Sequence, residues 1–227
     1  MVKPIVAYWD FRGRGEPIRY LLHYKKVDFE DKRYPNDAVG FQEWQKDKFS
    51  LGFDFPNLPY YIDGDIKLTQ SIAIMRYLGN KLGLDGKTDE EKRRVLVAEQ
   101  QSVDFRQKLR SFAMFNEYES AGKDEFLKSV QPMFQLWEKF LGDREFLAGD
   151  EVTYVDFLVF EFLDCYRLFH ETILDDYPSV KAYFSRIKNL SELQEYMKSP
   201  VRTPWTIFGP TAKFGGRGDP PKHLSFA

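Results

Sequence analysis

The sequence predicts an α/β domain at residues 1–83, followed by an all-helical domain at residues 90–227. Strand and helix signals alternate through the first segment, as in a mixed sheet covered by helices. Residues 82–89 contain two glycines and several charges, which indicates a linker. Beyond the linker, apolar residues recur with the period of an amphipathic helix.

The composition is that of a globular protein. Of the 227 residues, 43% are hydrophobic and 17% aromatic, enough to bury a core. The net charge of -2 gives no electrostatic reason to bind nucleic acid or an anionic membrane. No apolar run approaches the roughly 20 residues that span a bilayer, and the N-terminus lacks a signal-peptide pattern. We therefore expect a soluble cytoplasmic protein with neither a nucleic-acid partner nor a membrane partner.

The α/β domain is expected to begin with an apolar strand at residues 4–9. The glycine-containing segment 13–15 interrupts regular secondary structure and precedes a helix. An extended run at 29–34 is the second expected strand, and a loop at 35–40 leads into a short helix around Trp44. These elements form a βαβ unit.

Residues 57–78 contain the strongest local signals in the chain. Leu58-Pro59 is a candidate for a cis peptide bond before a short strand at 60–62. Asp63-Gly64 is a two-residue hairpin signal, and the strand 66–69 follows it. A ββα unit therefore completes the first domain.

Gln70-Ser71 opens the last helix of this domain, and Ser71 is a good candidate for its N-cap. The free N–H groups at a helix start attract carboxylates. Together with a proline that holds an extended chain nearby, they would suit a peptide-like, anionic ligand. The alternative is an ordinary hairpin followed by a helix.

In the helical domain, residues 126–141 have a helical apolar pattern, and residues 155–163 are apolar on nearly every side. The second segment is therefore predicted to be a buried central helix, and Thr153 and Asp156 form a capping box at its start. A further helix follows Pro178. Aromatic residues indicate that the tail packs onto the body of the protein: Trp205, Phe208 and Phe214.

No metal or cofactor site is predicted. His23, His170 and His223 are far from any spacing typical of metal ligands. The Gly13-x-Gly15 segment lacks the third glycine of a dinucleotide loop, and no phosphate loop occurs. Cys165, the only cysteine, excludes an intrachain disulfide and is expected to be a core residue.

Tyr8 is the residue best placed for chemistry, because it ends the first strand. Open α/β sheets bind ligands beyond the carboxyl ends of their strands, so a hydroxyl there can reach a bound molecule. A packing role is the alternative for Tyr8 taken alone. The anion-attracting segment at Gln70-Ser71 favours the catalytic interpretation.

Four strings resemble cytosolic glutathione S-transferases of the mu class: AYWDFRG at 7–13, DFPNLPYYIDGD at 54–65, LTQS at 68–71 and YVDF at 154–157. The resemblance covers essentially the whole chain. The tail, with FGG at 214–216 and PPK at 220–222, looks like that of flatworm mu-like members. The resemblance implies a thioredoxin-like domain that binds glutathione and a helical domain that supplies a hydrophobic-substrate wall.

It also implies roles for individual residues. Tyr8 would donate a hydrogen bond to the glutathione sulfur and so favour the nucleophilic thiolate. Gln70 and Ser71 would hold the γ-glutamyl carboxylate, and Asp104 would reach the glutathione amino group from the partner subunit. The remaining glutathione contacts would come from Trp9, Trp44 and Lys48 at the glycyl end and from Asn57 and Leu58 at the cysteinyl backbone.

The chain departs from the mu-class pattern around the second substrate. Arg14 replaces an apolar residue there, and it would favour electrophiles with a carboxylate or nitro group unless it points to solvent. Phe41 stands in place of an arginine near glutathione, and Met114-Phe115 in place of a tyrosine. Phe208 completes the expected second-substrate residues. Phe55 is expected to anchor a homodimer by inserting into the partner.

The expected function is conjugation of glutathione to hydrophobic electrophiles in detoxification, with glutathione as co-substrate and no cofactor. A glutathione-dependent isomerase or prostaglandin synthase on the same fold is an alternative, because Tyr8 would serve either reaction. A non-catalytic ligand-binding protein is another, although the retained glutathione residues argue against it. A thiol oxidoreductase is not expected, since residues 1–83 contain no cysteine.

Overall fold

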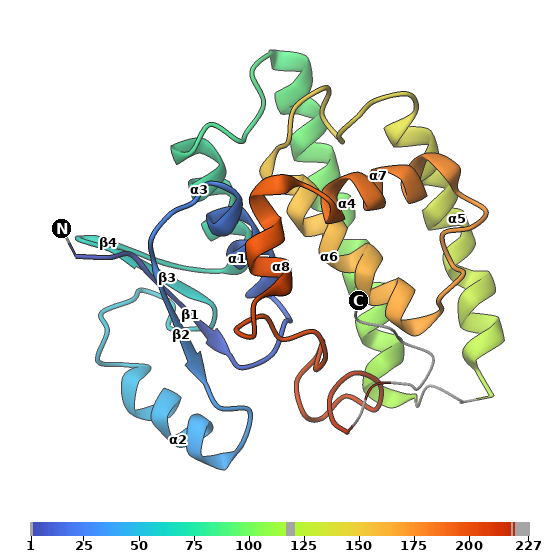
Figure 1. Cartoon of the computed structure of the whole chain (residues 1–227). Coiled ribbons are helices and arrows are strands. Elements are labelled where there is room, and N and C mark those ends of the chain that lie inside the picture. Colours follow the sequence, from blue (N-terminus) through green and yellow to red (C-terminus); the bar gives the residue numbers. More distant parts are fainter. Residues whose placement is uncertain (1, 117–120, 219, 221–227) are drawn as a thin grey trace.

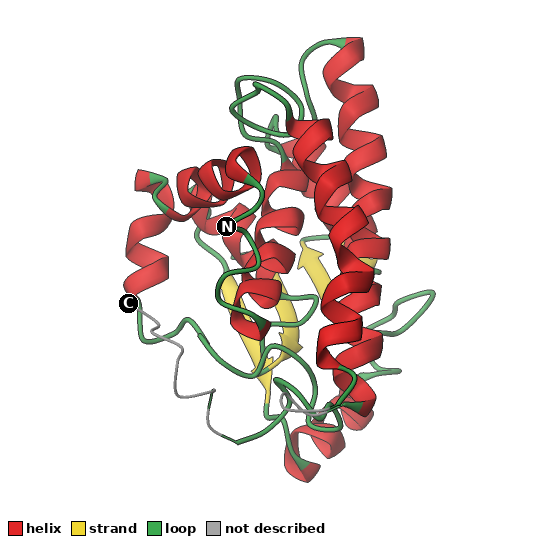
Figure 2. Cartoon of the chain, turned by 90° about the vertical axis from the view of Figure 1, so that its right-hand side faces the viewer, coloured by secondary structure: helices red, strands yellow, loops and turns green. Residues whose placement is uncertain are grey.

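The structure is a computed structural model that describes residues 2–116, 121–218 and 220. A four-stranded sheet with its own helices forms one side of the molecule, and longer helices form the other (Figure 1). Figure 2 shows the strands flanked by these helices. The fold therefore agrees with the prediction of an α/β part followed by a helical part.

The sheet has the strand order β2-β1-β3-β4. β1 pairs with β2 in parallel and with β3 antiparallel, and β3 pairs antiparallel with β4. The mixed sheet is thus the expected βαβ unit joined to a ββα unit. The strands are β1 (Ile5–Trp9), β2 (Glu30–Tyr34), β3 (Tyr60–Asp63) and β4 (Ile66–Thr69).

Three helices accompany the sheet: α1 (Glu16–Tyr24), α2 (Ala38–Asp47) and α3 (Ser71–Lys81). The predicted loop 35–40 is too long, because α2 already begins at Ala38. Its N-cap is Asp37, whose carboxylate accepts hydrogen bonds from the backbone N–H groups of Val39 and Gly40 at 2.9 and 3.0 Å. This cap satisfies helix-start donors that would otherwise lack partners.

The helical part contains α4 (Asp89–Phe115), α5 (Lys123–Leu141), α6 (Tyr154–Phe169), α7 (Pro178–Lys188), a 3₁₀ turn (Ser191–Leu193) and α8 (Gln194–Lys198). α6 is buried along nearly its whole length, as predicted. The capping box of Thr153 and Asp156 is also present. Asp156 additionally accepts hydrogen bonds from the backbone N–H of Leu147 at 3.0 Å and from the hydroxyl of Tyr183 at 3.0 Å.

A buried ion pair fixes the turn after β1 against the helical part. Arg12 is fully buried and lies 2.6 Å from Glu161 and 2.7 Å from Asp164 on α6. The tail reaches the same turn, because the backbone N–H groups of Arg12 and Gly13 donate to the carbonyl oxygens of Thr206 and Ile207. The carboxyl end of β1 is therefore held between α6 and the tail.

The tail packs onto the body of the protein, as its aromatic residues predict. Phe208 and Phe214 are buried, and Trp205 packs partly buried against the main core. Cys165 is buried in α6, in agreement with its expected place in the core.

Candidate functional site

A polar cavity of about 340 Å³ lies at the carboxyl end of β1. We call it the Tyr8 cavity. The turn after β1, the start of α3, one face of α4 and the tail all contribute to its wall. The lining residues are Tyr8, Phe11, Arg14, Asn57, Leu58, Gln70, Ser71, Arg106, Arg110, Met114, Phe208, Gly209 and Thr211.

Tyr8 is 6% exposed, and its ring meets that of Phe11 edge-on at 5.2 Å. Two glycines make room for it. A Cβ atom on Gly13 would lie 2.7 Å from the Tyr8 hydroxyl oxygen, and one on Gly15 would lie 2.8 Å from the ring. No described residue accepts a hydrogen bond from this hydroxyl, so it is available to a molecule in the cavity. The sequence indicated these glycines only as helix breakers.

Asn57 and Leu58 form the edge of the cavity beside the Leu58-Pro59 bond, which is cis as predicted. The backbone N–H of Leu58 donates to Asn57 Oδ1 at 2.9 Å. An extended ligand could lie along this edge.

The start of α3 differs from the prediction. Ser71 is the first helical residue, and Gln70 occupies the N-cap position with a φ of 70°. Such a φ is uncommon for a residue other than glycine and is typical of strained segments at ligand sites. No side chain caps the helix, so its first N–H groups can meet an anion. The expected anion-attracting segment is thus present, with Gln70 instead of Ser71 at the N-cap position.

Arg14 lines the Tyr8 cavity, in contrast to the alternative that it points only to solvent. Its Nη1 donates to the Ser71 hydroxyl oxygen at 3.3 Å. The guanidinium group therefore lies beside the residue expected to hold the glutathione carboxylate.

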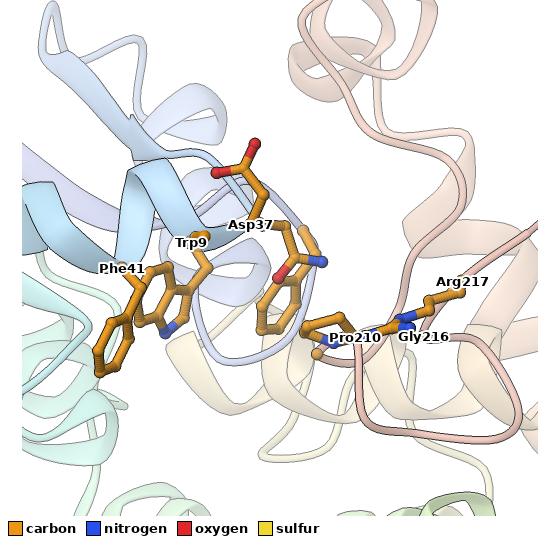
Figure 3. Close-up of a pocket in the computed structure, with 10 residues that line it drawn as sticks. Trp9, Asp37, Phe41, Pro210, Gly216 and Arg217 are labelled. Atoms are coloured by element: carbon orange, nitrogen blue, oxygen red, sulfur yellow. The ribbon is translucent and has the colours of Figure 1, made fainter.

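A second, larger and mostly apolar pocket of about 710 Å³ adjoins the first. We call it the Phe41 pocket. Trp9 and Phe41 lie on one side of it, and Pro210 and Gly216 of the tail lie opposite (Figure 3). Phe11 and Gly209 line both spaces, so the two are neighbours. Sequence analysis did not single out Phe11, which lies within the string AYWDFRG.

Trp44 and Lys48 line neither space. Trp44 is buried beneath the site, with its ring 5.7 Å from that of Tyr34 and 6.2 Å from that of Tyr60. The Lys48 ammonium group lies 5.3 Å from the centre of the Phe49 ring. Neither side chain points into the Tyr8 cavity within one chain.

Phe115 was expected among the second-substrate residues, but it does not line the Tyr8 cavity. Successive residues of a helix point about 100° apart, so Phe115 turns away when Met114 faces the cavity. The Phe115 side chain is 82% exposed. Asp104 is also exposed on α4 and lies outside the Tyr8 cavity.

The α4 wall carries Arg106 and Arg110, two residues that sequence analysis missed. Their spacing of four from each other and from Met114 places all three on one helix face, and this pattern could have revealed them. Burial lowers the pKa of Arg106 to about 10, and the like charges of Arg14 and Arg110 act in the same direction. The cavity is therefore strongly positive.

Phe55 is not part of the core, and 74% of its surface is exposed. The Thr69 hydroxyl donates to the Phe55 carbonyl oxygen at 2.8 Å and so ties this loop to β4. On the helical part, an apolar pocket of about 450 Å³ opens between α4 and α5. Val97, Leu136 and Phe140 are among its lining residues.

Within the described ranges, no three His, Cys, Asp or Glu side chains come together as a metal site. In the same part of the chain, every helix is too short or too polar to cross a bilayer.

The chain matches two protein-family descriptions. Residues 4–80 match "Glutathione S-transferase, N-terminal domain", and residues 103–200 match "Glutathione S-transferase, C-terminal domain". Between them they include every residue of the Tyr8 cavity except those of the tail.

Curated relatives include "Glutathione S-transferase class-mu 26 kDa isozyme 7" of Fasciola hepatica. It is 41% identical over 217 residues, which is 95% of this chain and 98% of that protein. "Glutathione S-transferase Mu 1" of Mus musculus is 43% identical over 216 residues, 94% of this chain and 99% of that protein. The solved structure of the glutathione S-transferase Blo t 8 aligns with a TM-score of 0.76 and 33% identity, covering 93% of this chain and 99% of that one.

Proposed function

The chain belongs to the mu-class glutathione S-transferases, and from this premise we propose how its two cavities conjugate glutathione to hydrophobic electrophiles. Glutathione is the co-substrate, and the reaction needs no cofactor. The biological role is detoxification in the cytoplasm. Residues 1–83 bind glutathione, and residues 90–227 provide most of the wall for the second substrate.

The observation that carries this proposal is the place of the Tyr8 hydroxyl. It lies in the same cavity as the uncapped start of α3 and the edge formed by Asn57 and Leu58. A free thiol has a pKa of about 8.5 and is mostly protonated at neutral pH. Because a hydrogen bond from Tyr8 favours the charged sulfur, it lowers the thiol pKa by about one unit for each 1.4 kcal/mol of preference.

Glutathione then lies in an extended form across the cavity. Its γ-glutamyl carboxylate meets Gln70 and Ser71, and its cysteinyl backbone follows Asn57 and Leu58. The glycyl end reaches Trp9, Trp44 and Lys48. Since Lys48 now lies over the Phe49 ring, its side chain must turn to meet that carboxylate. Trp44 is 5% exposed, so little of its side chain is available to the ligand.

The hydrophobic electrophile occupies the neighbouring Phe41 pocket and the α4 side of the Tyr8 cavity. Met114 and Phe208 supply apolar contacts there, and Arg14 a charge. Because Phe11 borders both spaces, an electrophile in the Phe41 pocket can place its reacting carbon toward the sulfur held by Tyr8. The thiolate then forms the new bond to carbon as the leaving group departs with its electron pair.

The functional unit is proposed to be a homodimer. The exposed Phe55 ring of one subunit would enter the apolar α4–α5 pocket of the other. An aromatic ring buries a large apolar area, and a twofold interface uses the contact twice. Asp104 would then approach the partner's glutathione site from the exposed face of α4.

Turnover of an electrophile panel tests this function. Aromatic halides, enals and peroxides are assayed with glutathione, and glutathione affinity is measured by calorimetry. We expect conjugation of at least one halide or enal, in which the electrophile and the thiol of glutathione are consumed at matching rates. Tight glutathione binding without any turnover would instead support the non-catalytic alternative. Turnover of a carbonyl or endoperoxide substrate alone would support the isomerase or synthase.

A further inference from the structure

Three guanidinium groups line the Tyr8 cavity, and none of them has a carboxylate partner among the described residues. Arg14 comes from the turn after β1, and Arg106 and Arg110 come from successive turns of α4. Across the described part of the chain, the hydrogen bond from Arg14 to the Ser71 hydroxyl is the one polar contact found for these three side chains. No carboxylate lies within ion-pair distance of any of them among the described residues.

The fully buried arginines of this protein, Arg12 and Arg19, are arranged differently. Arg12 is paired with Glu161 and Asp164, and Arg19 with Glu16 and Asp31. These carboxylates hold the pKa of both arginines above its ordinary value.

Arg106 shows the opposite shift, because burial and the neighbouring Arg14 and Arg110 all disfavour its charge. Arg106 is partly buried, and a partly buried cation without a counter-charge is costly, so such positions are typical of functional sites. The group that compensates this charge is therefore expected to come from a bound ligand.

We propose that Arg106 and Arg110, assisted by Arg14, form a subsite for an anionic group on the second substrate, such as a carboxylate or sulfonate. This proposal rests on the proposed function, because it takes glutathione to lie along Asn57, Gln70 and Ser71. The face of α4 opposite that edge then remains for the electrophile. Guanidinium groups suit this task, since their planar donors match the geometry of a carboxylate.

The subsite orients the electrophile and takes no part in bond making. In the reaction of an aryl chloride, the thiolate forms the carbon–sulfur bond and chloride leaves with the carbon–chlorine electron pair. Arg110 lies on the α4 wall with Met114, so it holds the anionic substituent of the ring while the apolar part contacts Met114 and Phe208. Loss of the subsite is therefore expected to raise KM for the electrophile.

A matched pair of electrophiles tests the subsite: para-chloro-meta-nitrobenzoate and its methyl ester. The ratio of their kcat/KM values is measured for the wild type, Arg110→Gln and Arg110→Lys. Because intrinsic reactivity cancels between enzymes, a change in the ratio reports recognition of the carboxylate. We expect Arg110→Gln to lower the acid-to-ester ratio roughly tenfold, the usual effect of losing one charge-assisted hydrogen bond, and Arg110→Lys to restore part of it.

Lys128→Gln is the control, because it removes a positive charge from the exposed surface of α5. It should leave the ratio unchanged. An unchanged ratio in Arg110→Gln would overturn the subsite. So would a loss of glutathione affinity in Arg110→Gln with no change in the ratio, because the arginines would then serve the carboxylates of glutathione.

A second measurement does not depend on turnover. Binding of meta-nitrobenzoate is measured by calorimetry in the presence of S-methylglutathione. The wild type is expected to bind it more tightly than Arg110→Gln, and added salt should weaken the binding. Equal affinity in both proteins overturns the subsite even if the enzyme conjugates neutral electrophiles. Conversely, failure of conjugation with retained anion binding would count against the proposed function alone.

Discussion

At the residue scale, the activity proposed here depends most on the Tyr8 hydroxyl and on the space that surrounds it. Gly13 and Gly15 leave room for the ring, and Phe11 supports it from the side. A hydroxyl held in this way can donate to a sulfur without reorganising, which is the condition for effective stabilisation of an anion.

Tyr8→Phe should therefore lower turnover much more than glutathione affinity. The loss of one preorganised donor to an anion typically costs ~10²–10³ in rate, and a partly exposed sulfur should lie toward the lower end. Stopped-flow or steady-state rates with an aryl halide measure the loss. Ultraviolet difference spectra of bound glutathione should show a higher thiol pKa in the variant. Wild-type rates, or an unchanged thiol pKa, would contradict the role given to Tyr8.

His23 gives a prediction about pH and stability. Burial lowers its pKa from 6.5, although Asp31 and Glu16 act in the opposite direction, and its ring stacks on Tyr196 at 4.0 Å. The unfolded state therefore binds more protons than the folded state at pH values between the lowered folded-state pKa and 6.5. Stability from the neutral ring is thus complete above pH 6.5 and is lost as the pH falls from 6.5 through the lower folded-state pKa.

His23→Gln should consequently flatten the dependence of the free energy of unfolding on pH between about pH 7 and pH 5. Urea denaturation at both ends of this range measures it. A slope as steep as that of the wild type would assign the acid sensitivity to other groups.

At the element scale, features decided by local sequence were predicted well. The capping box of α6 and the hairpin after Asp63 both depend on a few neighbouring residues, and both are present. The error at Ser71 has a different origin. Gln70 adopts its unusual backbone conformation within the folded cavity, which local propensity does not encode.

The mu-class resemblance also located eight of the thirteen residues that line the Tyr8 cavity. Arg106 and Arg110 were missed, although their spacing from Met114 was an available signal, because α4 meets the cavity only through the packing of the two parts of the chain. For the same reason sequence analysis did not distinguish Met114, which lines the cavity, from the exposed Phe115.

The start of α6 provides a stability prediction. Asp156 accepts hydrogen bonds from Thr153, Leu147 and Tyr183, and it is fully buried. Asp156→Ala removes a helix cap and leaves buried donors without partners, so we expect a loss of roughly 3 kcal/mol or more in the free energy of unfolding. Asp175→Ala, which breaks only an exposed pair with Lys181, should cost under about 1 kcal/mol. Similar urea midpoints for the two variants would contradict the structural role of the cap.

At the scale of the whole molecule, the Tyr8 cavity exists because several distant segments of the chain meet. Arg12 joins the turn after β1 to α6, and the tail closes over the same turn through Thr206 and Ile207. A site assembled from distant segments depends on the packing between them. The proposed dimer extends this dependence to a second chain, since Asp104 faces outward from α4.

Phe55 supplies the test of that dimer. Its ring is 74% exposed in the single chain, and the α4–α5 pocket offers an apolar space of about 450 Å³ for it. Full burial of such a ring contributes roughly 1.5–3 kcal/mol, and twofold symmetry applies the contribution twice. Phe55→Ser should therefore shift the protein toward monomers at micromolar concentration, as measured by light scattering. Phe115→Ser, which also removes an exposed ring, should leave the dimer intact.

Glutathione affinity should fall together with dimerisation in Phe55→Ser, because the partner's Asp104 would no longer reach the bound glutathione. A glutathione titration followed by calorimetry, carried out over a range of protein concentrations, separates the two effects. If affinity recovers as concentration drives the variant back to dimers, the site is completed by the second subunit. A wild-type chain that is monomeric at micromolar concentration and fully active would show instead that one subunit contains the whole site.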